Sequence, residues 1–113
     1  MKIIAFTKDI FFAAKIESVA KLVGSQVVIV DSLEKLAVNL TGVRKIILDL
    51  EMPDLNVEEI VQKINAFGSK PIMVGYLSHI KMETLGAAAK QVGCDYVVPR
   101  SEFSKHLAEI LKS

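Results

Sequence analysis

The sequence has 113 residues, which predicts a single domain over residues 1–113 with one hydrophobic core. Hydrophobic residues make up 51% and charged residues 24%, which excludes a disordered chain, and every apolar run is shorter than the roughly 20 residues of a membrane-spanning helix. The net charge is only +1, so we expect no binding to nucleic acid or to an anionic membrane.

The first half of the chain alternates strand-like with helix-like segments. Apolar runs predict three strands, Lys2–Phe6, Gln26–Val30 and Arg44–Leu50. The helix between the first two begins after Asp9, a suitable N-cap, and ends at Gly24. The helix between the second and third begins after Asp31, where Glu34 completes a capping box, and ends at Gly42.

The second half continues the same alternation. Helical spacing of apolar residues predicts a helix that begins after Asn56 and ends at Gly68. A further helix begins after Ser78 and stops at Gly93, and a last one is capped by Ser101. Apolar runs predict the fourth and fifth strands, Pro71–Tyr76 and Cys94–Val98.

Five strand–helix units of this length predict an α/β fold. Parallel strands need right-handed helical crossovers, so we expect five helices on the two faces of one five-stranded sheet, a flavodoxin-like three-layer sandwich with strand order 2-1-3-4-5. Ligands of such sheets bind outside the carboxyl ends of the strands. This rule selects four segments as the candidate site: Thr7–Asp9, Asp49–Asn56, Gly75–His79 and Pro99–Arg100.

The residues after the third strand carry a family resemblance. Asp49 is followed, after two intervening residues, by the pair Met52-Pro53. The CheY-like receiver domains of bacterial response regulators place their phosphoacceptor Asp at the end of this strand, with a Met-Pro pair after it. Further similarity lies in Pro71, in Ala87-Ala88-Ala89 and Gly93, and in Tyr96-Val97-Val98. The whole chain therefore resembles a receiver domain of two-component systems, of a divergent or pseudo-receiver type.

The resemblance implies a phosphoryl-transfer pocket, and the sequence departs from it. Receivers hold Mg²⁺ with an acidic pair after the first strand, which falls here on Thr7 and Lys8. The Ser/Thr that ends the fourth strand falls on Tyr76, or on Gly75 in a shifted register, and the Lys of the fifth strand is replaced by Pro99-Arg100. The expected pocket residues are Thr7, Lys8, Asp9, Asp49, Tyr76 and Arg100.

Two interpretations of Asp49 remain open. It could be a phosphoacceptor, or it could anchor its loop or pair with Lys8 or Arg100. We expect a cation such as Lys8 where the metal would have been, and Mg²⁺ only if the phosphorylation site is active, with Asp49 and Asp9 as weak ligands. Asp9 is more simply a helix N-cap. No other cofactor is expected.

These features favour a stand-alone receiver-like signalling module that is not an enzyme and that acts by binding a protein, either a histidine kinase or a downstream signalling protein. A homodimer is possible by the same resemblance. The resemblance places the docking or switch face near four residues, Met82, Lys90, Tyr96 and Phe103. Tyr96 could equally be an ordinary strand aromatic. The single cysteine, Cys94, is expected in the core and fits a cytoplasmic protein.

Two alternatives stay open. The first is a functional phosphorelay receiver that is phosphorylated on Asp49, with Asp9 as a partial metal ligand. The second is a flavodoxin-like domain that binds a small molecule at the carboxyl ends of the strands. The second alternative loses support if Lys8, Tyr76 and Arg100 fill that cleft.

Overall fold

The strands form one parallel sheet in the computed structural model, which describes residues 2–113. Their order is β2-β1-β3-β4-β5, as the sequence predicts. Apolar runs place β1 and β2 at their predicted bounds, whereas the ends of the other three strands differ from the prediction by one or two residues. The strands are β1 (Lys2–Phe6), β2 (Gln26–Val30), β3 (Val43–Asp49), β4 (Ile72–Leu77) and β5 (Tyr96–Pro99).

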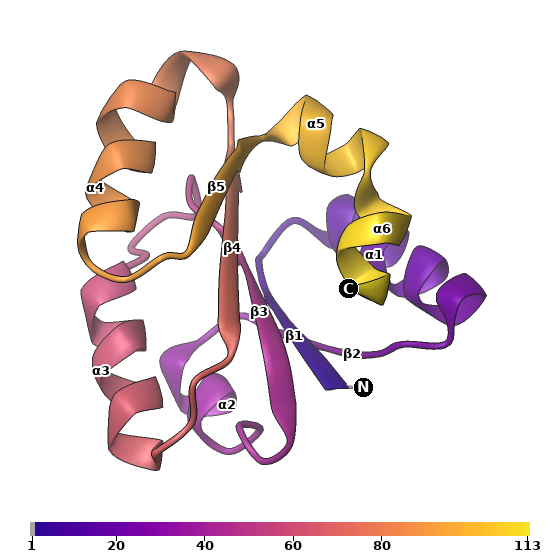
Figure 1. The fold of residues 1–113 in the computed structure, drawn as a ribbon, viewed down its shortest axis with the longest axis horizontal. Coiled ribbons are helices and arrows are strands. Elements are labelled where there is room, and N and C mark those ends of the chain that lie inside the picture. Colours follow the sequence, from indigo (N-terminus) through magenta and orange to yellow (C-terminus); the bar gives the residue numbers. More distant parts are fainter. Residues whose placement is uncertain (1) are drawn as a thin grey trace.

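Helices cover both faces of the sheet and give the predicted three layers. One face carries α1 (Ile10–Val23), α5 (Arg100–Lys105) and α6 (Leu107–Lys112), and the other carries α2 (Leu33–Ala37), α3 (Val57–Phe67) and α4 (Ala87–Gln91) (Figure 1). A 3₁₀ turn, His79–Lys81, and a π turn, Met82–Gly86, lead into α4. Within residues 2–113, no helix is long and apolar enough to cross a membrane.

The core has two halves, one on each side of the sheet. Alternate side chains of a strand point to opposite faces, so neighbours such as Ile46 and Ile47 belong to different halves. Tyr76 and Phe103 are the largest fully buried side chains of the α1/α5/α6 half. Because both faces of the central strands are covered, these strands are apolar along most of their length.

The start and end of α1 follow directly from the sequence. The Asp9 carboxylate accepts hydrogen bonds from the backbone N–H groups of Phe11 and Phe12, at 3.1 and 3.0 Å. Gly24 ends the helix with a φ of +75°, a conformation that costs little without a Cβ atom. Asn56 caps α3 as predicted, because its side-chain oxygen accepts from the N–H of Glu59. The two N-caps, Asp9 and Asn56, fix where the loops after β1 and β3 end at the carboxyl end of the sheet.

The predicted boundaries of α2 are wrong at both ends. Ser32, not Asp31, caps the helix by accepting from the N–H of Lys35, while the Asp31 carboxylate forms an ion pair with Lys35 at 2.9 Å. The helix ends at Ala37, before the predicted stop at Gly42, which lies in the turn before β3. Two adjacent residues with capping side chains made the start ambiguous.

The last predicted helix is two helices. Arg100 is its first residue, after Pro99 in extended conformation, so Ser101 is not the cap. His106 then interrupts the helical backbone with φ −107° and ψ 20°, which separates α5 from α6. The structure therefore has six α-helices within residues 2–113, rather than the predicted five. The early start matters for the site, because it places Arg100 at the junction of β5 and α5.

Candidate functional site

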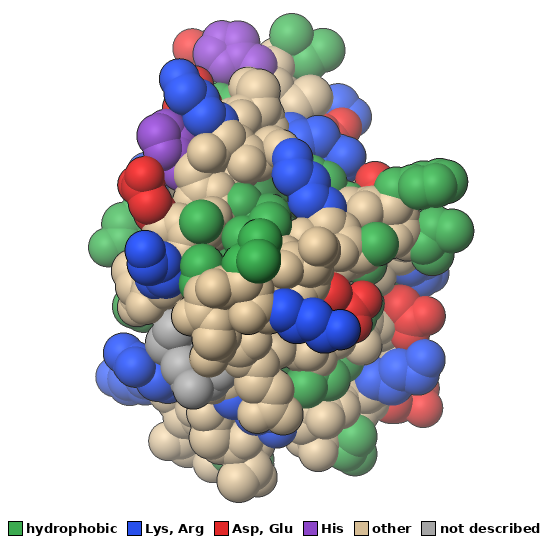
Figure 2. Space-filling model, turned by 90° about the vertical axis from the view of Figure 1, so that its right-hand side faces the viewer, with side chains coloured by type: hydrophobic (Ala, Val, Ile, Leu, Met, Phe, Trp, Pro, Cys, Tyr) green, Lys and Arg blue, Asp and Glu red, His purple; other side chains and the backbone are tan. Residues whose placement is uncertain are grey.

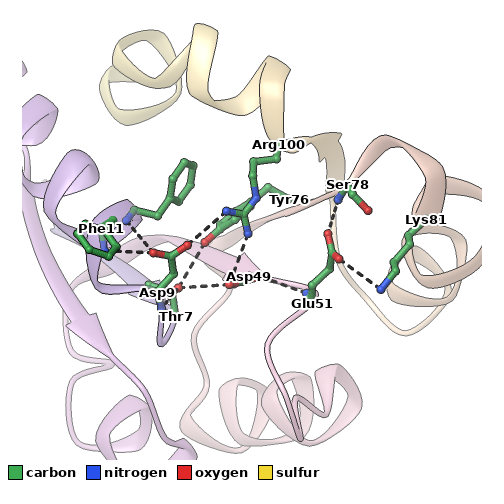
Figure 3. A network of polar contacts seen from close by, with 10 residues as sticks. Thr7, Asp9, Phe11, Asp49, Glu51, Tyr76, Ser78, Lys81 and Arg100 are labelled. Atoms are coloured by element: carbon green, nitrogen blue, oxygen red, sulfur yellow. Dashed lines mark hydrogen bonds and ion pairs between the residues drawn. The ribbon is translucent and has the colours of Figure 1, made fainter.

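Five of the predicted pocket residues meet at the carboxyl end of the sheet. Thr7 follows β1, Asp9 caps α1, Asp49 ends β3, Tyr76 lies in β4 and Arg100 begins α5 (Figure 3). The parallel strand order places these ends side by side, since β1 pairs with β3, and Asp49 stands opposite Tyr76. The segments chosen from the sequence therefore form one site.

Asp49 is the buried acid of this site, with 6% of its surface exposed. One carboxylate oxygen accepts from the backbone N–H of Glu51 at 3.1 Å. The other accepts from the Thr7 hydroxyl at 3.4 Å and lies 4.0 Å from a guanidinium nitrogen of Arg100. Asp49 thus holds its own loop and faces a cation.

Arg100 joins the two acids. One of its nitrogens lies 3.3 Å from an Asp9 carboxylate oxygen, and the other is the one that faces Asp49. Its guanidinium carbon also lies 5.1 Å from the ring centroid of Phe12 and 5.2 Å from that of Tyr76. A guanidinium suits this position because it is planar, stacks on aromatic rings and offers several N–H donors at once.

Asp9 is therefore both a helix cap and a partner of Arg100. The backbone N–H of Phe12 is the main reason that the pKa of Asp9 lies below its ordinary value, and Arg100 lowers it further. Desolvation acts in the opposite direction and is outweighed. The Asp9 backbone N–H also donates to the Thr7 hydroxyl at 3.1 Å. Both oxygens of Asp9 thus have partners in the protein itself.

Tyr76 closes the floor of the site. Its ring stacks on Phe103, with centroids 4.9 Å apart, and lies 4.7 Å from the ring of Phe12. Its hydroxyl donates to the Thr7 oxygen at 3.4 Å. Burial raises the pKa of the phenol well above its ordinary value, so Tyr76 stays neutral and acts as a donor.

Lys8 does not take the place of a metal, contrary to our expectation. Its side chain is exposed, and it makes no ion pair with a described residue, whereas Arg100, at the start of α5, reaches both acids. Cavities of about 180 and 200 Å³ lie on either side of Lys8. Lys8 and Arg100 both lie near the pocket in the sequence-based prediction, and the structure shows that Arg100 contacts the acids.

A second polar contact fastens the loop after β4. The Glu51 carboxylate accepts from the backbone N–H of Ser78 and forms an ion pair with Lys81 at 3.3 Å (Figure 3). The Ser78 hydrogen bond is the main reason that the pKa of Glu51 is lowered. Sequence reasoning missed this contact, although a charged residue two positions after Asp49 was the available signal.

Gly75 is required by packing. A Cβ atom at this position would lie 2.6 Å from a methyl carbon of Leu50, well inside normal contact distance. The glycine lies within β4, and the side chain of Leu50 fills the space beside it. A glycine at this position is therefore explained by packing against Leu50.

The residues present do not fit Mg²⁺. Thr7 and Lys8, which follow β1, bring no carboxylate to the site, and Arg100 lies between its two carboxylates, Asp9 and Asp49. Within residues 2–113, no group of three or more His, Cys, Asp or Glu side chains is arranged to hold a metal ion. A hard divalent cation prefers several oxygen ligands, and a guanidinium at the same place repels it.

The predicted docking residues differ in their exposure. Tyr96 is 58% exposed, Lys90 is exposed and Met82 is half-buried. Phe103, predicted on or near the docking face, is fully buried beneath Tyr76 and so cannot itself contact a partner. It lies on the inner side of α5, facing the sheet. Cys94 is in the core, as expected, and burial raises the pKa of its thiol.

Charges are mixed over the visible surface. Figure 2 looks onto the side that carries α1, α5 and α6, and it shows blue and red side chains interspersed around apolar ones in the middle of the face. No large area of a single sign appears there. This face therefore shows no basic surface of the kind that binds a phosphate backbone.

The sequence matches no family model and no curated protein. Solved structures do match. A response regulator receiver domain protein from Clostridium thermocellum gives a TM-score of 0.77 at 18% identity, covering 97% of this chain and 90% of that one. The receiver domain of the response regulator TorR gives 0.76 at 18% identity, with coverages of 97% and 95%.

A third match carries a metal. The receiver domain of a sensor histidine kinase from Pseudomonas aeruginosa, with magnesium coordinated in its active site cleft, gives a TM-score of 0.76 at 14% identity, covering 98% of this chain and 93% of that one. All three are receiver domains, and all match along nearly the whole described chain. The resemblance inferred from the sequence is thereby confirmed at the level of the fold. This protein has the fold of a response regulator receiver domain.

Proposed function

We propose that this chain is a receiver-like signalling module that recognises a protein partner, and that its pocket works without Mg²⁺ and without phosphorylation. One observation carries the proposal: the Arg100 guanidinium bridges Asp9 and Asp49. Phosphoryl transfer to a carboxylate needs cationic groups free to contact the transferred oxygens. Here the cation is already engaged by two carboxylates of the protein.

The electrostatic balance of the pocket supports this proposal. Arg100 contributes one positive charge, and Asp9 and Asp49 contribute two negative charges. An incoming phosphoryl donor is itself an anion, so without a metal it meets a net negative site. Breaking the Arg100 contacts to admit the donor would also leave Asp49 buried without its cation, which is costly.

The partner is proposed to bind the surface around α4 and β5. Lys90 is exposed on α4, and Tyr96 is exposed at the start of β5 with its ring on the α6 side of the sheet. Exposed aromatic side chains are enriched in protein interfaces. A histidine kinase, a downstream signalling protein or a second copy of the chain are the candidates. This surface is separate from the Arg100 pocket, so partner binding does not require chemistry at Asp49.

A phosphorelay receiver is the second candidate. One observation favours it: Asp49 stands at the carboxyl end of β3, and its 4.0 Å contact with Arg100 is longer than a direct hydrogen bond. A phosphoryl group could then accept from Arg100. The small-molecule alternative has less support, because Tyr76 and Arg100 fill the centre and the cavities beside Lys8 are below the roughly 300–1,000 Å³ of usual ligand sites.

The test is a titration with beryllofluoride and Mg²⁺ followed by backbone amide NMR. The native protein and Asp49→Asn should both show no shifts near position 49 at millimolar reagent. A Thr7→Asp/Arg100→Gln double variant adds a carboxylate and removes the competing cation, so it should gain Mg²⁺-dependent shifts and prove that the assay detects a working pocket. Shifts in the native protein that vanish in Asp49→Asn would establish the phosphorelay instead.

A pull-down with the native protein, Asp49→Asn and Tyr96→Ala as baits tests partner binding. Native protein and Asp49→Asn should retain the same protein equally, whereas Tyr96→Ala should lose it. Retention that needs an intact Asp49, or that survives Tyr96→Ala, would contradict the proposed route of recognition.

A further inference from the structure

The opposite end of the sheet holds a second cation, and its surroundings are apolar. Lys45 lies near the start of β3, four residues before Asp49, which is roughly 13 Å along the strand. Its side chain points to the same face as Ile47, toward α6. Only 3% of Lys45 is exposed.

A cavity of about 380 Å³ opens beside Lys45. Its walls are apolar side chains that β4, β5 and α6 point to this face. They are Ile72, Val74, Tyr96, Val98 and Ile110, and Lys45 and Ser113 complete the lining. Ile72 and Tyr96 are partly exposed, so the cavity is open to the surface. Its volume lies within the usual range for small-molecule sites, unlike the cavities beside Lys8.

The chain does not supply an anion to this cation. The Lys45 ammonium donates to the backbone oxygen of Ile110 and to the Ser113 hydroxyl, the latter at 2.8 Å. Among residues 2–113, no carboxylate lies within 4.0 Å of it. An ammonium has three N–H donors, so one remains for another acceptor. Burial, and to a lesser extent the neighbouring Arg44, lowers the pKa of Lys45.

We propose that this groove binds a small apolar carboxylate, with its anionic head at Lys45 and its hydrocarbon tail along β4 and β5. The tail would cover Ile72 and Val98, and the head would complete the hydrogen bonding of the ammonium. A ligand with an apolar body and one charged end fits this cavity, because Lys45 is the one charged side chain among lining residues that are otherwise mostly apolar. The site is distinct from the Asp49 pocket and does not depend on the function proposed for that pocket.

Octanoate is the probe, with 1-octanol as the neutral match. Titration of the full chain, followed by amide NMR and calorimetry, should show saturable octanoate binding below about 1 mM, with shifts at β4, β5 and the end of α6. Octanol should bind about tenfold more weakly or worse, because it cannot form a charge-assisted hydrogen bond with the ammonium. Equal binding of the two probes, or no saturation, would overturn the proposal.

Three variants separate the site from non-specific adsorption. Lys45→Met keeps the stem and removes the charge, and should weaken octanoate binding about tenfold or more. Lys63→Met, an exposed lysine on α3 across the sheet, should leave it unchanged. Ile72→Glu places a carboxylate at the strand position paired with Lys45, where it can occupy the place of the octanoate head group, so it should abolish octanoate binding. This variant keeps Lys45, so it tests the site even if Lys45→Met does not fold.

Sedimentation velocity tests whether a second copy of the chain, rather than a carboxylate ligand, covers this groove. A monomer that binds octanoate supports the proposal. A native dimer that does not bind octanoate, and that Ile72→Glu converts to a monomer, would show that a second copy covers the groove and would overturn it.

Discussion

The two ends of the sheet each hold a cation, and they stabilise it in different ways. At the carboxyl end, Arg100 faces two carboxylates and lies against two aromatic rings. At the amino end, the Lys45 ammonium is buried against a helix carbonyl and a hydroxyl, beside an open apolar groove. The first charge is satisfied within the protein, and the second leaves room for an outside anion. The difference is that carboxylates of the protein neutralise Arg100, whereas no described carboxylate neutralises Lys45.

The largest expected effect comes from the aromatic support of the carboxyl end. Phe103→Ala should lower the free energy of unfolding by roughly 3–5 kcal/mol, because it leaves a cavity beneath Tyr76 and Phe12. Tyr96→Ala removes an exposed ring at the amino end and should cost less than about 1 kcal/mol. Urea unfolding of both variants measures the difference, and similar losses would mean that the two ends are supported alike.

The next largest effect is the difference in stability between variants that remove each of the two cations, Arg100 and Lys45. Arg100→Met should destabilise the fold by roughly 1–2 kcal/mol, since it removes a partly exposed ion pair and stacking contacts and leaves Asp49 without its cation. Lys45→Met should be neutral within about 1 kcal/mol or stabilising, because it replaces a buried charge that has no carboxylate partner by an apolar chain. Thermal and urea unfolding read out both. A loss for Lys45→Met as large as that for Arg100→Met would refute the distinction.

The smallest effect is a dependence on pH. The folded pKa of Asp9 is depressed below 3.8 and that of Glu51 below 4.5. A depressed acid contributes stability that is fully present above these ordinary values and is lost as the pH falls through the folded pKa. Unfolding free energy should therefore decline as the pH falls below about 4. Asp9→Asn should flatten part of this decline, and an unchanged slope would exclude Asp9 as a source.

The sequence predicted the fold because its elements are locally consistent. The runs Lys2–Phe6 and Gln26–Val30 became strands with the expected bounds, and Asp9 and Gly24 delimit α1 as expected. The break at His106 had no signal, since the apolar spacing continues through it to Leu107 and Leu111. Local sequence patterns therefore predicted the order of the elements more accurately than the residues at which they begin and end.

The sequence named the residues that meet at this end of the sheet, and for Asp49 it left open a loop contact and a pair with Lys8 or Arg100; the structure has the loop contact and the Arg100 pair. The strand order brings Thr7, Asp9, Asp49 and Arg100 together, and that order follows from the pattern. Whether Lys8 or Arg100 reaches the acids depends on side-chain direction, which the pattern does not contain. The burial of Lys45 was missed for a similar reason, because a lysine within an apolar strand is usually interpreted as lying at the edge or end of the sheet.

The placement of Tyr76 has a consequence for how many conformations the protein visits. Its ring is held between Phe12 and Phe103, and its hydroxyl is bonded to Thr7. Moving it out would break two aromatic contacts and expose buried area, at a cost on the order of 3 kcal/mol or more. A state at that free energy holds under about 1% of the molecules. We therefore expect the Tyr76 side of the carboxyl end to occupy almost entirely one conformer, so a ligand that needs the ring displaced would first have to supply that free energy.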